Sequence, residues 1–387
     1  MTSPAQPSAS ANVFSEGLED VVAGQSAICI IDGKQSKLFY RGYAIHDLAQ
    51  NSNYEETTYL LIFGSLPTER QLKEFCNKIA SEREIPKDLI RLIGEMPKTS
   101  NPMAALRTGV SLLSLFDAEA DDQSPESNLR KAIRLIARVP TIVAYFDRFR
   151  HSLPIVAPKT DASYNTAANF LYMLKGKDAT PVEIKMLDKY FILLTEHDFN
   201  ASTFTARTTA STLSDIYSAI VGGIGTLKGD LHGSANTRTM ESLLAIGDAS
   251  KVDAFVDETI ENKKKFMGFG HRVYKGPDPR ADDLREMAKE LAKGNPLQAK
   301  CFDISQKLEQ AVWTKKKLNC NVDFYSASVL YTIGIPIDLF TAMFAVSRMA
   351  GWTAHVLEQY SNNRLIRPVS QYIGEPPRSY LPLKDRK

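Results

Sequence analysis

The sequence predicts a mainly α-helical protein with two domains, and three observations support this. Apolar residues recur with helical periodicity through most of the chain after residue 50. Only the stretch from residue 27 to residue 40 combines β-prone residues with a turn signal, so a small N-terminal hairpin is the one sheet we expect. A charged segment separates two apolar helical ones, which indicates a smaller domain inserted into a larger helical core.

Length and composition set the broad class of protein. The chain has 387 residues, of which 43% are hydrophobic, and this is enough for a sizeable core. Because 47 basic residues balance 45 acidic ones, the charge gives no argument for a nucleic acid or a membrane surface as partner. The cysteines lack CxxC spacing, so we expect neither a zinc site nor a disulfide framework. They are Cys29, Cys76, Cys301 and Cys320.

The chain carries no recognisable targeting segment. Residues 1–13 are small, polar and proline-containing, and we expect them to form a flexible arm rather than a secretory signal or a mitochondrial presequence. The most apolar stretch, residues 326–352, contains Gly334, Pro336, Asp338 and Arg348, which favours buried helices over a membrane span. The sequence therefore predicts a soluble, cytoplasmic protein.

Individual elements can be predicted from local signals. The expected hairpin pairs residues 27–31 with residues 37–40 around the turn Asp32-Gly33. Capping-box patterns at Thr68-x-x-Gln71 and Thr180-Pro-Val-Glu183 each precede a periodic apolar run and predict helix starts. Pro140 is expected to kink or divide its helix. Further runs long enough for helices are residues 103–116, 129–146, 166–174 and 208–220.

The clearest compositional break is VGGIGTLKGD at residues 221–230. We predict flexible joints near residues 222–229 and near Gly334. The expected large domain then comprises residues 14–229 and 335–387, and the small domain comprises residues 230–334. A dinucleotide-binding loop is a poorer interpretation of these glycines, because the third glycine is missing and no strand–helix alternation surrounds them.

Three of the six histidines lie among small residues: His197 in EHDFNAS, His232 in DLHGSAN and His271 in GFGHRVY. Each alone would more often be structural than catalytic. We expect His232 at a helix N-terminus, where the helix dipole lowers its pKa and a neutral imidazole can donate a hydrogen bond to a developing enolate oxygen. The remaining histidines are expected to be structural or exposed, namely His46, His151 and His355.

An acidic residue and three arginines complete the candidate chemistry. Asp323 has apolar neighbours in NVDFYSAS, so desolvation would raise its pKa and make it a base able to take a proton from carbon. A helix N-cap is an equally good interpretation of this aspartate. The arginines lie beside proline, glycine or apolar residues, and their planar guanidinium groups together suit a dicarboxylate, although each alone could form a surface salt bridge. They are Arg280, Arg348 and Arg367.

The segment GFGHRVYKGPDPR, residues 268–280, has the composition of an anion-binding loop. Gly268 and Gly270 allow backbone N–H groups to approach a ligand, and Arg272 and Lys275 add positive charge. Lysine triplets at residues 263–265 and 315–317 flank the His271 and Asp323 motifs. Such triplets are usually solvated, but a polyphosphate ligand would also explain them.

Four motifs, DLHGSAN, GFGHRVYKGPDPRA, NVDFYSAS and SRMAGW…RLIRP, closely resemble the citrate synthase family in order and spacing. The likeness spans about residues 14 to 375. It implies an almost all-α fold whose two domains close over substrate, in an obligate homodimer. The sequence leaves open whether dimers assemble into higher oligomers. It also implies condensation of acetyl-CoA with oxaloacetate and water to give citrate and CoA. No metal or cofactor is then needed, because the CoA thioester is a substrate.

The resemblance also implies roles for residues at the matching positions. Asp323 would be the base on acetyl-CoA, His232 the donor to its thioester oxygen, and His271 the donor to the ketone of oxaloacetate. The substrate carboxylates would meet His197, Arg280 and Arg348, while Arg367 would reach into the neighbouring subunit's site. The residues implied to contact CoA are Phe266, Gly268, Gly270, Arg272, Lys275 and Lys316. Asp230 and Ser234 depart from the family's GPLHGGAN but leave His232 in place.

The sequence also leaves other functions to consider. A 2-methylcitrate synthase, which uses propionyl-CoA, shares every motif named above, and one methylene allows only about 1 to 3 kcal/mol of discrimination. A non-catalytic CoA-binding or assembly protein on the same scaffold would not need the intact set His232, His271 and Asp323. A nicotinamide dehydrogenase would require a βαβ pattern, which the sequence lacks.

Overall fold

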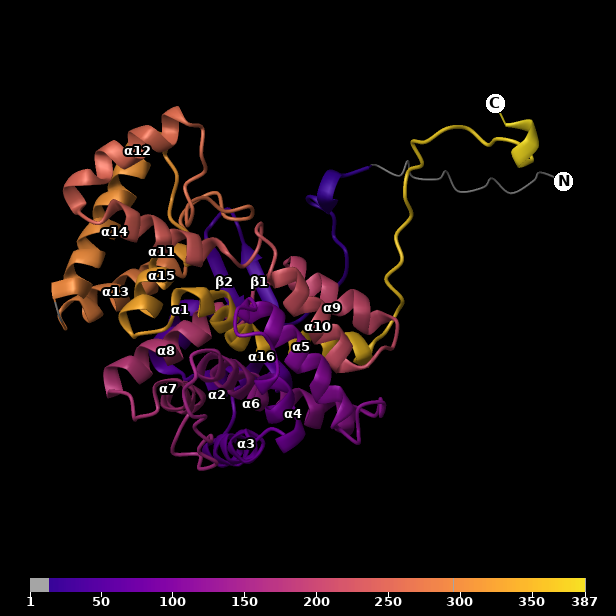
Figure 1. Cartoon of the computed structure of the whole chain (residues 1–387), viewed down its shortest axis with the longest axis horizontal. Helices are drawn as coiled ribbons and strands as arrows, with labels where there is room; N and C mark the ends of the chain where they lie inside the picture. The colour runs from indigo at the N-terminus through magenta and orange to yellow at the C-terminus, as the bar shows by residue number, and fades with distance from the viewer. Residues whose placement is uncertain (1–13, 295, 387) are drawn as a thin grey trace. The chain divides into compact units, whose positions relative to one another are not determined.

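The computed structural model describes residues 14–294 and 296–386 (Figure 1). Residues 26–364 form one compact unit, and residues 14–25 with 365–386 form a second. The expected arm of residues 1–13 lies outside the described residues.

The predicted hairpin is confirmed, and a third short strand extends it. Strands β1 (Cys29–Asp32), β2 (Lys37–Tyr40) and β3 (Tyr43–Ala44) form an antiparallel sheet in that order. Cys29 lies opposite Tyr40, and Asp32 lies opposite Lys37. Asp32 closes the turn because its Oδ1 accepts the backbone N–H groups of Lys34 and Gln35 at 3.0 and 2.8 Å. Strand β3 was not predicted, because two residues are too few to show an alternating pattern.

The rest of the compact unit is mainly helical, as predicted. Both capping boxes form: Thr68 with Gln71 begins α3, and Thr180 with Glu183 begins α8. In chain order the helices are α1 Ile45–Asn51, α2 Tyr54–Phe63, α3 Glu69–Ser81, α4 Lys87–Gly94, α5 Pro102–Leu115, α6 Pro125–Arg150, α7 Thr166–Lys175, α8 Pro181–Leu194, α9 Ala201–Ser211, α10 Ile216–Leu227, α11 Ala235–Ile246, α12 Val252–Glu261, α13 Ala281–Ala292, α14 Pro296–Lys316, α15 Val322–Thr332 and α16 Phe340–Ser361. Short 3₁₀ turns are η1 Glu16–Leu18, η2 Ala249–Lys251, η3 Ile337–Leu339 and η4 Leu383–Asp385.

The helix predicted across residues 208–220 is wrong, because two helices meet there. Helix α9 ends at Ser211 and α10 begins at Ile216. Leu213 between them has a left-handed backbone, with φ of 62°, which a continuous helix does not allow. Asp215 accepts the backbone N–H of Ser218 at 2.9 Å and so caps α10. The prediction missed this N-cap because Asp215 lies within a mainly apolar run that was interpreted as one helix.

Among the glycines of the joint predicted near residues 222–229, Gly229 alone lies outside α10. Gly222, Gly223 and Gly225 lie inside α10, and the turn begins only after Leu227. A Cβ at Gly223 would lie 3.3 Å from the ring of Trp352, so this glycine permits close helix packing rather than bending. Gly334, in contrast, has a φ of 80° in the turn after α15. The division into a large and a small domain stays a prediction.

Pro140 does not divide its helix, since α6 runs unbroken from Pro125 to Arg150. A proline inside a helix costs about 3 kcal/mol, because it removes one hydrogen bond and crowds the preceding turn. Helix α6 tolerates this because it is buried along most of its length and packs against α3, α4, α5, α7 and α16. Tertiary packing therefore outweighs the local preference at this position.

Helix α16 is the centre of the core, and it packs against α2, α6, α8, α9 and α10. It buries Trp352 and also the charged Arg348. Helices α11 to α15 pack mainly among themselves, and Figure 1 shows α12, α13, α14 and α15 grouped together. No helix in residues 14–294 or 296–386 has the length and apolar character that crossing a membrane requires.

Two glycines on buried helices give a matched test of this packing. A Cβ on Gly351 in α16 would collide with the backbone oxygen of Thr195 and with Oε2 of Glu196, whereas a Cβ on Gly225 in α10 would lie 3.8 Å from Arg107. We expect Gly351→Ala to lower the free energy of unfolding by about 1 to 3 kcal/mol through overpacking. Gly225→Ala should be neutral or stabilising by up to about 1 kcal/mol. Chemical denaturation of both variants measures this, and equal stability of the two would contradict the packing described.

Candidate functional site

His197 lies in the turn between α8 and α9 and is almost fully buried. Its Nε2 lies 3.1 Å from the hydroxyl of Tyr274, and its ring centre lies 5.2 Å from that of His271. Burial holds the pKa of His197 well below its usual range, and the nearby charges of Arg280 and Arg348 lower it further. His197 is therefore a neutral imidazole within electrostatic range of two arginines.

The second histidine of this pair, His271, is held by its own loop. Its Nδ1 accepts the backbone N–H groups of Val273 and Tyr274 at 3.0 and 3.2 Å. Because Nδ1 is the acceptor, the proton of the neutral ring stands on Nε2, which can donate to a ligand. Burial lowers the pKa of His271 to about 4, with a further contribution from Arg280. The sequence did not single out Tyr274, although its ring lies 4.6 Å from the ring of His271.

Arg280 is buried, and its charge is compensated by Asp278. Its Nε and Nη2 donate to the two carboxylate oxygens of Asp278 at 2.9 and 2.8 Å, and both side chains are at most 2% exposed. This pairing leaves Nη1 of Arg280 for a further acceptor. Asp278 was not predicted as a site residue, although the spacing PDPR places it two residues from the arginine.

Asp323 is the second residue of α15, and Asn321 is the N-cap of that helix. The N-cap interpretation of Asp323 is therefore wrong, because Asn321 accepts the backbone N–H of Asp323 at 3.0 Å. Burial raises the pKa of Asp323 to about 7, although Arg280 and Arg348 act in the opposite direction. Its Oδ1 has no hydrogen-bond partner among the described residues. A buried carboxylate in this condition is a candidate base.

Arg348 projects from the middle of α16 and is 1% exposed. Its Nε donates to the backbone oxygen of Leu194 at 2.8 Å, and its guanidinium lies 4.9 Å from the ring centre of Phe344. Its Nη1 is buried and, within the described ranges, lacks a hydrogen-bond acceptor. The charge of Arg348 influences the pKa values of His197, His232 and Asp323. It is the shared electrostatic neighbour of residues from three separate segments.

His232 lies in the turn between α10 and α11, two residues before the N-cap Ser234. It thus precedes the helix N-terminus at which we expected it. Burial lowers the pKa of His232 to about 4, and Arg348 contributes to this. Its Nε2 lies 2.8 Å from Oγ of Ser202, which also accepts the indole N–H of Trp352 at 3.1 Å. Ser202 is a third residue that the sequence did not reveal, since a serine inside a helix carries no distinctive pattern.

The glycine-rich loop lies against the segment that leads into α15. Gly268 and Gly270 have φ values of 80° and 78°. The backbone N–H of Gly270 donates to the oxygen of Asn319 at 2.8 Å, and that of Asn321 donates to the oxygen of Gly268 at 2.9 Å. A Cβ on Gly268 would lie 3.0 Å from the Cα of Phe324, so the close approach requires glycine. The loop is therefore fixed next to Asp323.

The remaining predicted contacts are residues in or next to this loop, Lys316 at the end of α14, and Arg367. Phe266 contacts Phe269, with ring centres 6.2 Å apart, and Lys316 is the last residue of α14. The backbone N–H of Lys275 donates to the oxygen of Gly33 at 3.0 Å, so the loop also contacts the hairpin. Arg272 lies between His271 and Val273. Arg367 belongs to the terminal unit, and its role stays a prediction.

The other three histidines have structural partners. His355 is fully buried, with Nε2 2.9 Å from Glu196 and Nδ1 3.0 Å from Arg207. His46 pairs with Asp283, and His151 with Asp147. This agrees with their prediction as structural or exposed residues.

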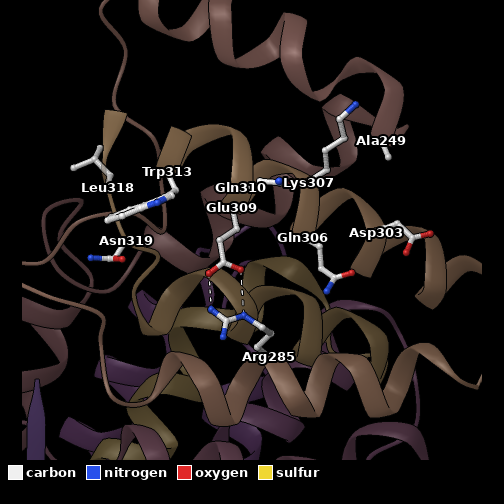
Figure 2. A pocket seen from close by; sticks show the side chains of 10 residues that line it. All are labelled: Ala249, Arg285, Asp303, Gln306, Lys307, Glu309, Gln310, Trp313, Leu318 and Asn319. Atoms are coloured by element: carbon white, nitrogen blue, oxygen red, sulfur yellow. Dashed lines mark hydrogen bonds and ion pairs between the residues drawn. The ribbon is translucent and has the colours of Figure 1, made fainter. Parts of the chain in front are cut away.

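A cavity of about 740 Å³ lies along α14, apart from this cluster (Figure 2). None of the predicted site residues lines this cavity. The lining residues are Ala249, Arg285, Asp303, Gln306, Lys307, Glu309, Gln310, Trp313, Leu318 and Asn319. Arg285 and Glu309 form an ion pair within it, and Glu309 also accepts the hydroxyl of Tyr325 in α15 at 2.6 Å. This cavity is thus bordered by a polar connection between α13, α14 and α15.

The structure thus brings six of the predicted residues into one electrostatically connected cluster: His197, His232, His271, Arg280, Asp323 and Arg348. Neutral imidazoles can donate hydrogen bonds, arginines can bind carboxylates, and a desolvated carboxylate can accept a proton. The arrangement suits proton abstraction next to a bound anion. In residues 14–294 and 296–386, no group of three or more His, Cys, Asp or Glu side chains is arranged to hold a metal ion.

Comparison with known proteins agrees with this chemistry. Residues 17–369 match the family model described as citrate synthase, C-terminal domain. The chain is 48% identical to citrate synthase 2 of Bacillus subtilis (strain 168), across 96% of this chain and 98% of that protein. It is 41% identical to the 2-methylcitrate synthase of Shewanella oneidensis, across 96% and 97% respectively.

A solved structure shows the same fold. It is the ternary complex of carboxymethyl coenzyme A and oxaloacetate with citrate synthase from the archaeon Thermoplasma acidophilum. Its TM-score to this structure is 0.90 at 34% identity, covering 97% of this chain and all of that one. The mainly helical fold expected from the sequence is thereby confirmed. The chain belongs to the citrate synthase family.

Proposed function

We propose that this chain is a citrate synthase, a transferase that condenses acetyl-CoA with oxaloacetate and water to give citrate and CoA. The observation that carries the proposal is the buried Asp323, whose unpartnered carboxylate oxygen lies in one cluster with Arg280 and Arg348. Family membership supports it, as does the relative whose complex contains oxaloacetate and a CoA analogue. The reaction as proposed needs no metal or cofactor.

Oxaloacetate binds through its carboxylates in this mechanism. Arg348 offers the buried Nη1 that lacks an acceptor among the described residues, and Arg280 offers Nη1 beyond its contact with Asp278. His197 adds a neutral hydrogen-bond donor near the two arginines. His271 donates its Nε2 proton to the ketone oxygen, since Nδ1 already accepts two backbone N–H groups. The ketone carbon is polarised as a result.

Carbon–carbon bond formation begins with proton transfer to Asp323. The Asp323 carboxylate takes a proton from the methyl group of acetyl-CoA while His232 donates a hydrogen bond to the thioester oxygen, which stabilises the enolate. Ser202 Oγ lies 2.8 Å from Nε2 of His232 and donates its own proton to Oδ1 of Asn200 at 2.8 Å, so it fixes the His232 ring beside α9. The enolate carbon attacks the ketone carbon, and His271 protonates the new alkoxide. Water cleaves the thioester to release CoA, and solvent returns a proton to His271 and removes the one on Asp323.

The CoA moiety is proposed to lie along the glycine-rich loop. Phe266, Gly268, Gly270 and Arg272 belong to that loop, which is fixed beside the N-terminus of α15. Lys275 and Lys316 are proposed to meet its phosphates. From the family likeness we also propose a homodimer in which Arg367 reaches the neighbouring subunit's site and the small domain closes over substrate. A cytoplasmic location is proposed from the sequence composition.

A 2-methylcitrate synthase is the second candidate, because a relative of that name is 41% identical over nearly the full chain. Initial rates of CoA release with acetyl-CoA and with propionyl-CoA, at saturating oxaloacetate, separate the two. We expect kcat/KM to favour acetyl-CoA by about 10-fold or more, the discrimination that one methylene allows. Reactions without oxaloacetate correct for thioester hydrolysis. A preference for propionyl-CoA would establish the second candidate instead, and no oxaloacetate-dependent CoA release with either thioester would exclude both.

The pH dependence of kcat tests the assignment of the base. Asp323 must be ionised to accept a proton, and its pKa is raised to about 7, so kcat should rise with pH through neutrality. His232 and His271 stay neutral down to about pH 4, so they should not limit kcat above about pH 5. Steady-state assays between about pH 5 and 9 at saturating substrates measure this. A kcat that is flat across neutrality, or that falls as the pH rises through it, would argue against Asp323 as the base.

A further inference from the structure

Asp278 uses both carboxylate oxygens to join two parts of the site. Its Oδ1 accepts the backbone N–H of Arg280 at 3.1 Å and the side-chain Nε of Arg280 at 2.9 Å. Its Oδ2 accepts Nη2 of Arg280 at 2.8 Å and the backbone N–H of Val322 at 3.0 Å. Val322 is the first residue of α15 and directly precedes Asp323. One carboxylate, 1% exposed, therefore holds both the arginine and the start of the helix that carries the base.

We propose that Asp278 is a positioning residue that couples the carboxylate-binding Arg280 to the placement of Asp323. The inference rests on the proposed function, in which Arg280 holds oxaloacetate and Asp323 is the base. The backbone N–H of Val322 is one of the first N–H groups of α15, which have no partner within the helix. Asp278 satisfies this group from another segment and so fixes where α15 begins. Asp278 itself does not touch substrate.

The geometry explains why an aspartate is required at this position. Each oxygen of Asp278 faces two N–H donors, so an asparagine would direct its NH₂ group against two donors in either orientation. It would also leave the buried guanidinium of Arg280 without a compensating charge. Asparagine has nearly the same shape as aspartate, and this substitution therefore removes the connection without creating a cavity.

Asp278 also changes the pKa of the proposed base, Asp323. The ionisable groups around it are Arg280 of its own segment, His271 and Tyr274 of the preceding loop, and Asp323 of α15. The negative charge of Asp278 raises the pKa of Asp323, while Arg280 and Arg348 lower it. Loss of this charge, with Arg280 left uncompensated, should lower the pKa of Asp323. The acid limb of the kcat profile should then move toward lower pH.

The test compares Asp278→Asn with Asp282→Asn in the full-length protein. Asp282 lies four residues away, its side chain is 73% exposed, and it pairs with Arg285 outside the cluster. We expect Asp278→Asn to raise the KM for oxaloacetate, and so to lower kcat/KM by about 10- to 100-fold, as the loss of charge-assisted hydrogen bonds implies, and to shift the acid limb of kcat toward lower pH. Asp282→Asn should leave both properties unchanged. Circular dichroism and thermal unfolding show whether each variant is folded.

The outcomes are distinguishable from failure of the proposed function. If the wild-type protein releases no CoA from either thioester in the presence of oxaloacetate, the proposed function fails. If the wild type is active and folded Asp278→Asn keeps its KM for oxaloacetate and its acid limb, only the positioning role is overturned. A loss of kcat alone, with KM and the acid limb unchanged, would equally overturn it, since a merely structural residue behaves in this way. Should Asp278→Asn fail to fold, Asp278→Ser is measured by the same criteria, since its smaller side chain leaves room for water beside Arg280.

Discussion

The buried ion pair between Asp278 and Arg280 is the interaction on which the geometry of the site depends. An arginine that is 2% exposed requires a compensating charge, and Asp278 supplies it within the same turn of the chain. The same carboxylate accepts the first N–H of α15, so the loop that carries His271 and the helix that carries Asp323 meet at one point. Backbone bonds between Gly268, Gly270 and the segment 319–321 reinforce this contact.

Several groups in the cluster are arranged at a cost to stability. Asp323 Oδ1 and Arg348 Nη1 are buried without partners among the described residues, and burial opposes ionisation of Asp323. The raised pKa of Asp323 means that its contribution to stability is present at low pH and is lost as the pH rises through about 7. Unsatisfied donors and acceptors of this kind are expected where a ligand completes the hydrogen bonds. The large helical core around α16 compensates for the free energy lost by burying these unpaired groups.

The sequence predicted the fold class, the hairpin and both capping boxes, because each depends on local patterns. It failed at residues 208–220, where Leu213 adopts a left-handed backbone and Asp215 caps a second helix, and it did not show that Gly222, Gly223 and Gly225 lie inside α10. The motifs identified the residues that the structure brings together, but not Asp278, Ser202 or Tyr274. These three act through contacts with residues distant in the chain or through short loop geometry, and neither leaves a periodic signal. The position of Arg367, the domain boundaries and the dimer remain predictions.

The central claim is that Asp323 is a base placed beside a dicarboxylate site. The most direct measurement is CoA release by Asp323→Asn with acetyl-CoA and oxaloacetate, alongside calorimetric titration of the same variant with oxaloacetate. The account predicts loss of turnover by at least about 100-fold, as expected when a general base is removed, while oxaloacetate still binds and the protein stays folded. Turnover at the wild-type rate in a folded Asp323→Asn protein would contradict it.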